Sequence, residues 1–468
     1  MSLWPDSFLQ QTRALLGDGE CAALCRALES EAPVSLRLNP SKPGRLPGTP
    51  DGHVPWCENG VYLPQRPSFT FDPLFHAGCY YVQEAASMFI EQAFRRMDFT
   101  PHRLLDLCAA PGGKSTLWRT LLPAGALLVA NEPLPQRAVV LAENMAKWGH
   151  PDVAVTCAYP EAFAALGGFF DVVAADVPCS GEGMFRKDKG AVSEWSPAGV
   201  ALCAERQMQI VRGVWPALRE GGYLVYSTCT FNRSEDEDNV RRICDELGAE
   251  AVAIDVPAEW GVTGDVTGGR LPVYRFLPHR TRGEGFFMAL LRKTSEAPAG
   301  RNERRARRGR KETGVPGCAT AAGWLKDAAR FRLCRTDDTQ IAAWREELAD
   351  DFSRIRATVR TLRAGIPLAE EKGRKLVPCH ELALSTERAP GAFPHAHLDR
   401  DAAIAYLRRE AAVLGGDVPR GYVIATYEGH ALGFLNNLGT RANNLYPQEW
   451  RIRSRHDEPF SDEQNITT

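Results

Sequence analysis

The stretch Leu104-Leu-Asp-Leu-Cys-Ala-Ala-Pro-Gly-Gly-Lys-Ser115 decides the fold. It opens with a short apolar run of strand length and ends where a helical pattern begins at Lys114. The two glycines between them permit a tight turn and a close approach of the backbone to a ligand. A buried strand that passes through a glycine turn into a helix is typical of a parallel α/β sheet, in which ligands bind beyond the carboxyl ends of the strands.

Further apolar runs follow this stretch and alternate with segments of helical periodicity. The predicted strands are Leu104 to Leu107, Leu127 to Ala130, Val153 to Thr156, Val172 to Asp176 and Tyr223 to Ser227, with two possible edge strands at Ala251 to Ile254 and Phe286 to Leu291. The predicted helices are Lys114 to Leu122, Pro135 to Trp148, Pro197 to Leu218 and Ser234 to Leu247. This alternation predicts a Rossmann-like core around a mostly parallel, seven-stranded sheet.

The last of these helices begins with an acidic run. Ser234 and Glu237 have the spacing of a capping box, and the run Glu235-Asp-Glu-Asp238 suits the positive end of a helix dipole. We therefore interpret the run as structural rather than catalytic.

The composition changes along the chain and predicts five segments. Residues 1–80 contain two amphipathic helical stretches and form an N-terminal extension, and residues 81–295 form the α/β domain. A basic linker at 296–316 leads to a small mixed α+β domain at 317–385 and a second small domain at 386–468. In the last of these, Gly421 to Thr426 and Ala431 to Leu435 are predicted strands.

Overall composition excludes several classes of protein. The 468 residues include no apolar run of membrane-spanning length, and the N-terminus has no basic segment followed by an apolar one. The 13 cysteines are scattered, without the spacing of a zinc site, which is typical of a reducing compartment. We therefore expect a cytoplasmic protein with no membrane partner, no metal and no evident obligate protein partner. His395 and His397 are close in sequence, but they suit a solvated loop better than a metal site.

Positive charge is concentrated in two places although the net charge is only −2. The first is a run from Arg301 to Lys311 with seven basic residues and one acid, and the second comprises Arg441, Arg451, Arg453 and Arg455. The run at 301–311 is compatible both with a solvated linker and with a strap that contacts phosphates.

The glycine loop itself specifies its ligand only coarsely. It lacks the GxGxxG pattern of dinucleotide-binding loops, and although Gly113-Lys-Ser resembles the end of a phosphate-binding loop, Cys108 stands where that motif needs its first glycine. Glu132, about twenty residues later, follows the second strand, where an acid can accept hydrogen bonds from both hydroxyls of a ribose. Arg137 is one helical turn further and could pair with Glu132.

Two cysteines follow adjacent central strands, Cys179 after the fourth and Cys229 after the fifth. A thiolate that adds to carbon 6 of cytosine makes carbon 5 nucleophilic, so that it can take a methyl group from a sulfonium. Asp176 would stabilise the charge that develops on the ring, and the carbonyls of Pro178 and its neighbours could read the exocyclic amine. The target base must then be unpaired or flipped out.

These segments together resemble the RsmB/RsmF and Nop/Sun family of RNA 5-methylcytosine methyltransferases. The matching stretches are Tyr81-Val-Gln-Glu-Ala-Ala-Ser-Met88, Asp106 to Lys114, Asn131-Glu132, Asp176 to Lys187 and Tyr226-Ser-Thr-Cys-Thr230. Asn443-Asn-Leu-Tyr-Pro-Gln-Glu-Trp-Arg-Ile452 is similar to the RsmF branch in particular.

The resemblance implies a fold, a cofactor and a substrate. It implies a Rossmann-like methyltransferase core that binds S-adenosyl-L-methionine, an N-terminal RNA-binding extension, a PUA-like C-terminal domain, and 16S rRNA or the small ribosomal subunit as substrate. Cys229 would be the nucleophile, Cys179 would assist product release, and Pro178 and Lys187 would contact the RNA. The implied cofactor-binding residues are Cys108, Ala109, Ala110, Pro111, Gly112, Gly113, Lys114, Glu132, Arg137 and Asp176.

The chain departs from the family pattern in two places. Val177 replaces a more usual alanine, and no Asn or Asp occurs between Cys157 and Tyr159, where the family commonly has one. The partner of the adenine amine is therefore not identified, and Tyr159 is the nearest residue with a polar group. Two alternatives remain open at this point: a nucleotide hydrolase, suggested by Gly113-Lys-Ser, and a non-catalytic RNA-binding factor with the same fold.

Overall fold

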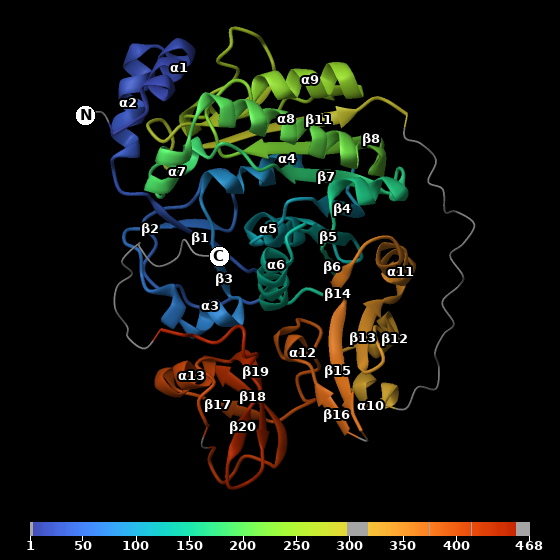
Figure 1. Ribbon diagram of the computed structural model, residues 1–468. Helices are drawn as coiled ribbons and strands as arrows, with labels where there is room; N and C mark the ends of the chain where they lie inside the picture. Colours follow the sequence, from blue (N-terminus) through green and yellow to red (C-terminus); the bar gives the residue numbers. More distant parts are fainter. Residues whose placement is uncertain (1–2, 297–316, 374, 413, 455–468) are drawn as a thin grey trace.

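The computed structural model describes residues 3–296, 317–373, 375–412 and 414–454. A sheet of nine strands forms the centre of the molecule (Figure 1). Five strands run parallel in the order β6-β5-β4-β7-β8. Their bounds are Arg103–Asp106 (β4), Leu127–Asn131 (β5), Val153–Thr156 (β6), Phe170–Asp176 (β7) and Leu218–Thr228 (β8). The order of strands reverses between β4 and β7, and such a reversal is where open parallel sheets bind their ligands.

The remaining strands of this sheet are antiparallel to their neighbours. At one edge β11 (Phe286–Lys293) pairs with β8, and both β10 (Val273–Phe276) and β9 (Ala249–Ala251) pair with β11. At the other edge β14 (Thr361–Ala364) pairs with β6. The predicted Rossmann-like, mostly parallel architecture is confirmed.

The predicted number of seven strands is wrong by two. The edge strand expected at Ala251 to Ile254 is instead β9, which ends at Ala251, and β10 was not predicted. β14 comes from more than 200 residues after β6, so no local pattern could have assigned it to this sheet.

The N-terminal extension contains strands as well as the two predicted helices. Helices α1 (Asp6–Leu16) and α2 (Asp18–Leu28) are followed by an antiparallel sheet in the order β2-β1-β3. Its strands are Val34–Leu38 (β1), Gly60–Leu63 (β2) and Tyr80–Val82 (β3), and α3 (Pro73–Ala77) precedes β3. Because these strands are short and separated by long loops, their pairing could not be read from the chain.

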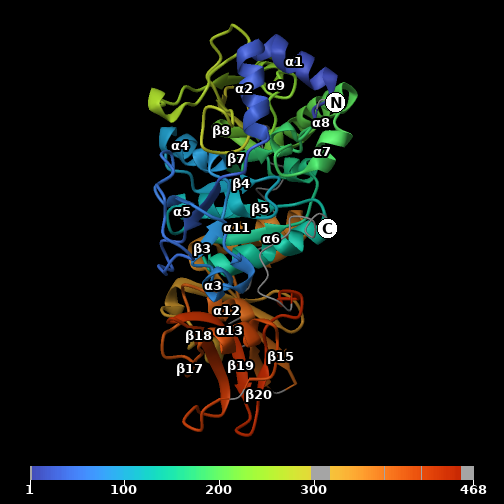
Figure 2. The same ribbon diagram turned by 90° about the vertical axis from the view of Figure 1, so that its left-hand side faces the viewer.

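Two four-stranded sheets form the other end of the elongated molecule (Figure 2). One contains β12 (Phe331–Arg335), β13 (Gln340–Arg345), β15 (Ile366–Lys372) and β16 (Lys375–Pro378). The other contains β17 (His395–His397), β18 (Gly421–Tyr427), β19 (His430–Asn437) and β20 (Ala442–Asn444), and α12 (His380–Leu384) and α13 (Arg400–Leu407) lie beside it. The domain boundaries inferred above stay a prediction, although β14 shows that the segment 317–385 also completes the central sheet.

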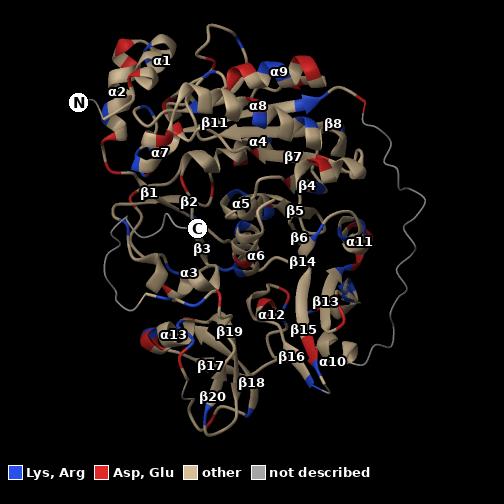
Figure 3. Cartoon of the chain, viewed as in Figure 1, with Lys and Arg blue, Asp and Glu red and all other residues tan. Residues whose placement is uncertain are grey.

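Charged side chains of both signs are interspersed along the surface helices, α9 (Glu237–Leu247) among them (Figure 3). The basic run at 301–311 and Arg455 lie outside the described residues, whereas Arg441, Arg451 and Arg453 are exposed. Within the described part of the chain, no helix is long and apolar enough to cross a membrane. The same residues contain no group of three or more His, Cys, Asp or Glu side chains placed to hold a metal ion.

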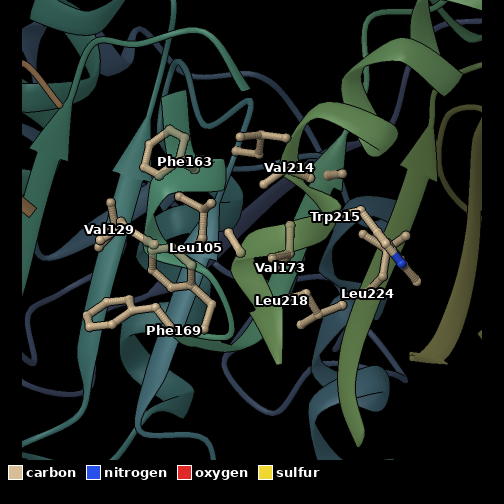
Figure 4. Packing of buried hydrophobic residues seen from close by; sticks show 14 of the residues in the cluster. Leu105, Val129, Phe163, Phe169, Val173, Val214, Trp215, Leu218 and Leu224 are labelled. Atoms are coloured by element: carbon tan, nitrogen blue, oxygen red, sulfur yellow. The ribbon is translucent and has the colours of Figure 1, made fainter. Parts of the chain in front are cut away.

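Hydrophobic layers cover both faces of the central sheet because successive strand residues point to opposite sides. On one face, Leu105, Val129, Val173 and Leu224 from four neighbouring strands pack against Phe163, Val214 and other residues, as Figure 4 shows. Helices α8 (Pro197–Val214), α9 and α11 (Ala349–Thr358) contribute to this layer. The opposite layer joins the other strand residues to α4 (Ile90–Arg96), α5 (Gly113–Leu121) and α6 (Pro135–Trp148).

The predicted helices are confirmed, and two of them are shorter than predicted by several residues at one end. Helix α8 ends at Val214 rather than Leu218, because Pro216 cannot continue the hydrogen-bonding pattern and Leu218 already belongs to β8. Helix α9 begins at Glu237, and Ser234 does not cap it.

The predicted capping box is therefore wrong. Asp236 and Glu237 are instead fully buried and form ion pairs of 2.8 and 2.6 Å with the guanidinium of Arg275, which comes from β10. The hydroxyl of Thr228, the last residue of β8, donates to Asp236 at 2.6 Å, so this network anchors the end of β8 to the start of α9. Such contacts agree with a structural role for the acidic run.

Candidate functional site

A cleft of about 1370 Å³ opens where the order of strands reverses. Loops that follow β4, β7 and β8 form part of its wall. The segment between α2 and β1, the end of β2, the residues around β3 and the start of β11 also line it. The predicted site residues that line it are Cys108, Ala109, Ala110, Pro111, Gly113, Lys114, Asp176, Lys187 and Cys229. Gly112, Glu132, Arg137, Pro178 and Cys179 are not part of its lining and lie behind or beside these residues.

The glycine loop is anchored to its neighbours through its backbone. The amide of Ala109 donates to the carbonyl of Asn131 at 2.8 Å, and the side chain of Asn144 donates to the carbonyl of Pro111 at 2.8 Å. Gly112 has a φ of 120°, a conformation that favours glycine, and it precedes α5 directly. The loop is thus shaped before any ligand binds, and its backbone faces the cleft.

Lys114 and Asp176 form an ion pair in the cleft wall, with 2.8 Å between Nζ and Oδ2. The hydroxyl of Ser227 donates to the other oxygen of Asp176, also at 2.8 Å. Burial opposes the charge of Lys114, but the carboxylate of Asp176 outweighs it, and the pKa of Lys114 is raised. These contacts hold both charges beside the ends of β7 and β8.

Asp106 lies deeper than this pair, at the end of β4. Burial raises the pKa of its carboxyl to about 7, although the Ser115 hydroxyl donates to it at 2.6 Å. Burial also raises the pKa of the neighbouring Cys108 thiol, which therefore stays protonated. Neither group has the properties of a nucleophile.

Glu132 and Arg137 form the predicted ion pair, with 3.5 Å between Arg137 Nη1 and Glu132 Oε2. The Glu132 side chain is only 2% exposed, and its other oxygen accepts a hydrogen bond from the amide of Leu134 at 3.1 Å. Arg137 also donates to the carbonyl of Ala110 at 3.2 Å, which connects the end of β5 with the glycine loop.

The two cysteines predicted to share a crevice are in contact, with 2.9 Å between their sulfur atoms. The amide of Cys229 also donates to the sulfur of Cys179 at 3.4 Å. The hydrogen bond to Cys229 and burial both raise the pKa of the Cys179 thiol well above its usual range. Cys229 lines the cleft, whereas Cys179, which is in contact with it, is not part of the lining.

A buried polar network, which was not predicted from the sequence, supports the loop around and after Cys179. Glu235 accepts hydrogen bonds from the amide of Ser180 at 3.0 Å and from the side chain of Gln207 at 2.7 Å. Gln207 also donates to the carbonyl of Pro178 at 3.1 Å. Glu182 accepts from the indole of Trp195 at 3.0 Å. The acidic run at 235–238 indicated a structural network, but a pattern along the chain could not show that Glu235 supports the loop after Cys179.

The opposite wall of the cleft contains further charged residues that were not predicted. Glu284 comes just before β11 and lies 3.4 Å from Lys187 and 3.5 Å from Arg186. Burial raises the pKa of Glu284 in spite of these two cations. Phe286, two residues later, packs beneath Lys114, whose Nζ lies 5.3 Å from the ring centre.

Tyr159 precedes the turn after β6 and is 67% exposed. The adjacent loop is held by Asn131, which donates to the carbonyl of Ala158 at 2.9 Å and accepts from its amide. The described structure therefore leaves the ring of Tyr159 free of close packing, and its contact with a cofactor stays a prediction.

Sequence models of three related domains match this chain. The model described as 16S rRNA methyltransferase RsmB/F matches residues 99–292, which contain most of the cleft. The N-terminal domain of 16S rRNA methyltransferase RsmF matches residues 4–85, and the methyltransferase RsmF PUA domain matches residues 393–452.

Two curated relatives extend this similarity to nearly the whole chain. The ribosomal RNA small subunit methyltransferase F of Enterobacter sp. (strain 638) is 31% identical over 480 residues, which cover 95% of either chain. The protein of the same name from Citrobacter koseri is 32% identical over 485 residues, which cover 95% of this chain and 96% of that one. The chain belongs to the ribosomal RNA small subunit methyltransferase F family. It is therefore a methyltransferase, which decides against the nucleotide-hydrolase alternative.

Solved structures show the same fold at lower identity. A methyltransferase homologue from Pyrococcus horikoshii has a TM-score of 0.54 at 24% identity and covers 62% of this chain and 95% of its own. The structure of NSun6 from Pyrococcus horikoshii with SFG has a TM-score of 0.53 at 19% identity and covers 62% of this chain and 99% of its own. These structures show the fold alone, whereas the family models and the curated relatives confirm the family resemblance inferred from the sequence.

Proposed function

We propose that this methyltransferase transfers a methyl group from S-adenosylmethionine to carbon 5 of a cytosine in 16S rRNA, through a covalent bond between Cys229 and the base. The observation that carries the proposal is the placement of Cys229. Its sulfur opens into the cleft beside the Lys114–Asp176 ion pair and lies 2.9 Å from the sulfur of Cys179. A nucleophile, an ion pair and a second thiol in one crevice suit covalent catalysis on a pyrimidine.

The residues around the glycine loop fit S-adenosylmethionine. The backbone of Cys108 to Pro111 faces the cleft, and Gly113 allows close approach at the start of α5. Glu132 places a buried carboxylate at the end of β5, where it could accept from ribose hydroxyls, and Arg137 holds it there. The solved NSun6 relative carries SFG, an analogue of this cofactor, on the same fold. When bound, the cofactor supplies the electrophilic methyl group.

The substrate proposal rests on the family and on the shape of the cleft. The curated relatives are named for the RNA of the small ribosomal subunit, and residues 393–452 match an RNA methyltransferase PUA domain. A stacked base cannot reach Cys229 inside the cleft, so the cytosine must be unpaired or flipped out. We assign RNA contacts outside the cleft to the N-terminal extension, the basic linker and the PUA-like domain, with Lys187 and Pro178 nearer to the base.

The chemistry follows from the positions of the two sulfur atoms. The Cys229 thiolate forms a bond to carbon 6 of the ring, and the electron pair that is displaced makes carbon 5 nucleophilic. Asp176, held by Lys114 and Ser227, faces the ring and stabilises charge as it develops. After carbon 5 gains its methyl group, its proton leaves to a base, the carbon–sulfur bond breaks and the thiolate is restored. Cys179 contacts the departing sulfur and is placed to assist this last step.

The first test replaces Cys229 by alanine. Methylation of 16S rRNA, measured by bisulfite sequencing, should be abolished, because Cys179, the other cysteine of the pair, does not line the cleft. Calorimetric titration should show S-adenosylmethionine binding close to that of the wild type. Cys203→Ala, on α8 and away from the cleft lining, is the matched control and should retain activity. Retention of more than a few per cent of wild-type turnover by Cys229→Ala would exclude the nucleophile.

The second test separates the roles of the two cysteines. Cys179→Ala should trap the enzyme on its RNA, seen as a protein–RNA band that survives denaturing electrophoresis, because release of the product stalls. The double variant with Cys229→Ala should give no such band, since it cannot form the bond. If Cys179→Ala is fully active and gives no band, Cys179 has a structural role only.

A further inference from the structure

Five carboxylates line the cleft, and they differ in whether their oxygen atoms are already engaged. Glu29 and Glu31 are exposed. Asp176 is occupied by Lys114 and Ser227. Glu84 accepts hydrogen bonds of 2.8–2.9 Å from three backbone amides. The fifth carboxylate, Glu284, is the exception.

Glu284 is buried and its oxygen atoms are not satisfied by hydrogen bonds. Its side chain is 5% exposed, and neither oxygen accepts a hydrogen bond from the described residues. Lys187 and Arg186 form ion pairs with this carboxylate at 3.4 and 3.5 Å, distances longer than those of ordinary charge-assisted hydrogen bonds. Burying a carboxylate without hydrogen bonds is costly, so a ligand that supplies donors is expected at this position.

The position of Glu284 is next to the nucleophile. β8 and β11 are adjacent strands (Figure 1) and pair in antiparallel fashion. Phe287 is opposite Thr228, so the residues that follow Thr228 and precede Phe287, Cys229 and Phe286, come next to each other. A Cβ atom on Gly183 would lie 2.7 Å from the carbonyl oxygen of Cys229 and 2.9 Å from that of Gly285. The backbone of Gly285, directly after Glu284, and the backbone of Cys229 therefore both lie close to Gly183. Phe286, two residues after Glu284, packs beneath Lys114, whose Nζ lies 5.3 Å from the ring centre.

We propose that Glu284 reads the target base by accepting a hydrogen bond from the exocyclic amine of cytosine. The inference rests on the proposed function and names a specificity-determining residue for it. Cytosine presents an amine where uracil presents a carbonyl oxygen, so a carboxylate favours the first and repels the second. The carbonyl of Pro178, which was expected to read this amine, already accepts from Gln207, and Pro178 does not line the cleft.

The test compares two RNAs that differ only by the amine. Bisulfite sequencing of wild-type methylation first locates the target cytidine, and its failure would refute the proposed function rather than this inference. An oligoribonucleotide around that position is then made with cytidine or with the pyrimidin-2-one ribonucleoside, which lacks the amino group. Both are bound to the Cys229→Ala protein, in which no covalent bond can form. The protein with Glu284 intact should bind the cytidine RNA about tenfold more tightly or better, the effect of one hydrogen bond to a charged acceptor.

Substitution of Glu284 should remove this preference. In the Cys229→Ala background, Glu284→Met fills the same space without an acceptor, and Glu284→Ala is a second variant in case the first does not fold. With either variant, the ratio of the two dissociation constants should fall to about one. Glu31→Gln removes an equal charge from the same cleft. Both RNAs should bind to it slightly more tightly through weaker repulsion, and the ratio should stay unchanged.

Two results would overturn the inference. One is an equal affinity of the two RNAs for the protein that retains Glu284, since the amine would then not be read at all. The other is a tenfold preference that persists in a folded Glu284→Met or Glu284→Ala variant. A purely structural role for the ion pair with Arg186 would lower the affinity for both RNAs together and leave their ratio unchanged.

Discussion

Replacement of Gly183 by alanine tests whether the loop after Cys179 positions the nucleophile. The new Cβ atom would lie 2.7 Å from the carbonyl oxygen of Cys229 and 2.9 Å from that of Gly285. Both atoms belong to the backbone, so the loop must withdraw by about 0.5–0.7 Å to reach ordinary contact at 3.4 Å. This movement breaks the 2.8 Å hydrogen bond from the Gly183 amide to the same Cys229 carbonyl.

The expected cost has two parts. The overpacked contact costs about 1–3 kcal/mol, and the lost hydrogen bond about 1 kcal/mol, so the free energy of unfolding should fall by about 2–4 kcal/mol. A domain of ordinary stability survives such a loss. Because the carbonyl that moves belongs to the nucleophile, we expect methyl transfer to slow by at least about tenfold, since a misplacement of about 1 Å can cost a hundredfold.

Single-turnover methyl transfer to 16S rRNA and urea denaturation measure the two effects separately. Gly190→Ala, in the short helix α7 (Lys189–Glu194) on the same loop, is the matched control. Its Cβ atom would meet only the flexible side chain of Asp188, at 2.9 Å, and alanine favours a helix by about 1 kcal/mol. The control should therefore stay close to wild type. A Gly183→Ala protein with a rate within twofold of wild type and unchanged stability would refute the reasoning.

Three further predictions concern the rest of the molecule. Arg275→Met should lower the free energy of unfolding by about 3–5 kcal/mol in urea denaturation, because it leaves Asp236 and Glu237 buried without their cation; a loss below 1 kcal/mol would contradict this. Tyr159→Ala should weaken S-adenosylmethionine binding by about 1–2 kcal/mol in calorimetry and leave RNA affinity unchanged, whereas an unaltered dissociation constant means that other groups hold the adenine. Charge reversal across Arg304 to Lys311, outside the described residues, should raise the RNA dissociation constant and flatten its salt dependence; an unchanged slope would indicate a plain linker.

The outline of the site could be predicted because it depends on strand ends. Each apolar run that ends in Asp106, Glu132, Asp176 or Cys229 belongs to one parallel sheet, and the carboxyl ends of parallel strands meet at one edge. The sequence alone was therefore enough to expect the glycine loop, the acids and the cysteine pair in one crevice. Motif order then indicated the family, and the comparisons confirm it.

Other features of the site needed the folded chain. The capping box at Ser234 was a reasonable local interpretation, but Glu237 finds a stronger partner in Arg275, which comes from a strand that was not predicted. The pairing of Glu284 with Lys187 likewise joins segments almost a hundred residues apart.

The sequence by itself thus determined the α/β class, the positions of the core strands along the chain and the family, because these depend on periodicity and on motifs that are contiguous along the chain. Only the tertiary structure decided that β14 completes the sheet, that Cys229 rather than Cys179 faces the cleft, and that Glu284 is buried there with unsatisfied oxygens. Burial and ion pairing between distant segments depend on how the layers pack, and the free energy of a carboxylate changes with every charge and donor that packing brings near it. A linear pattern contains no record of those neighbours.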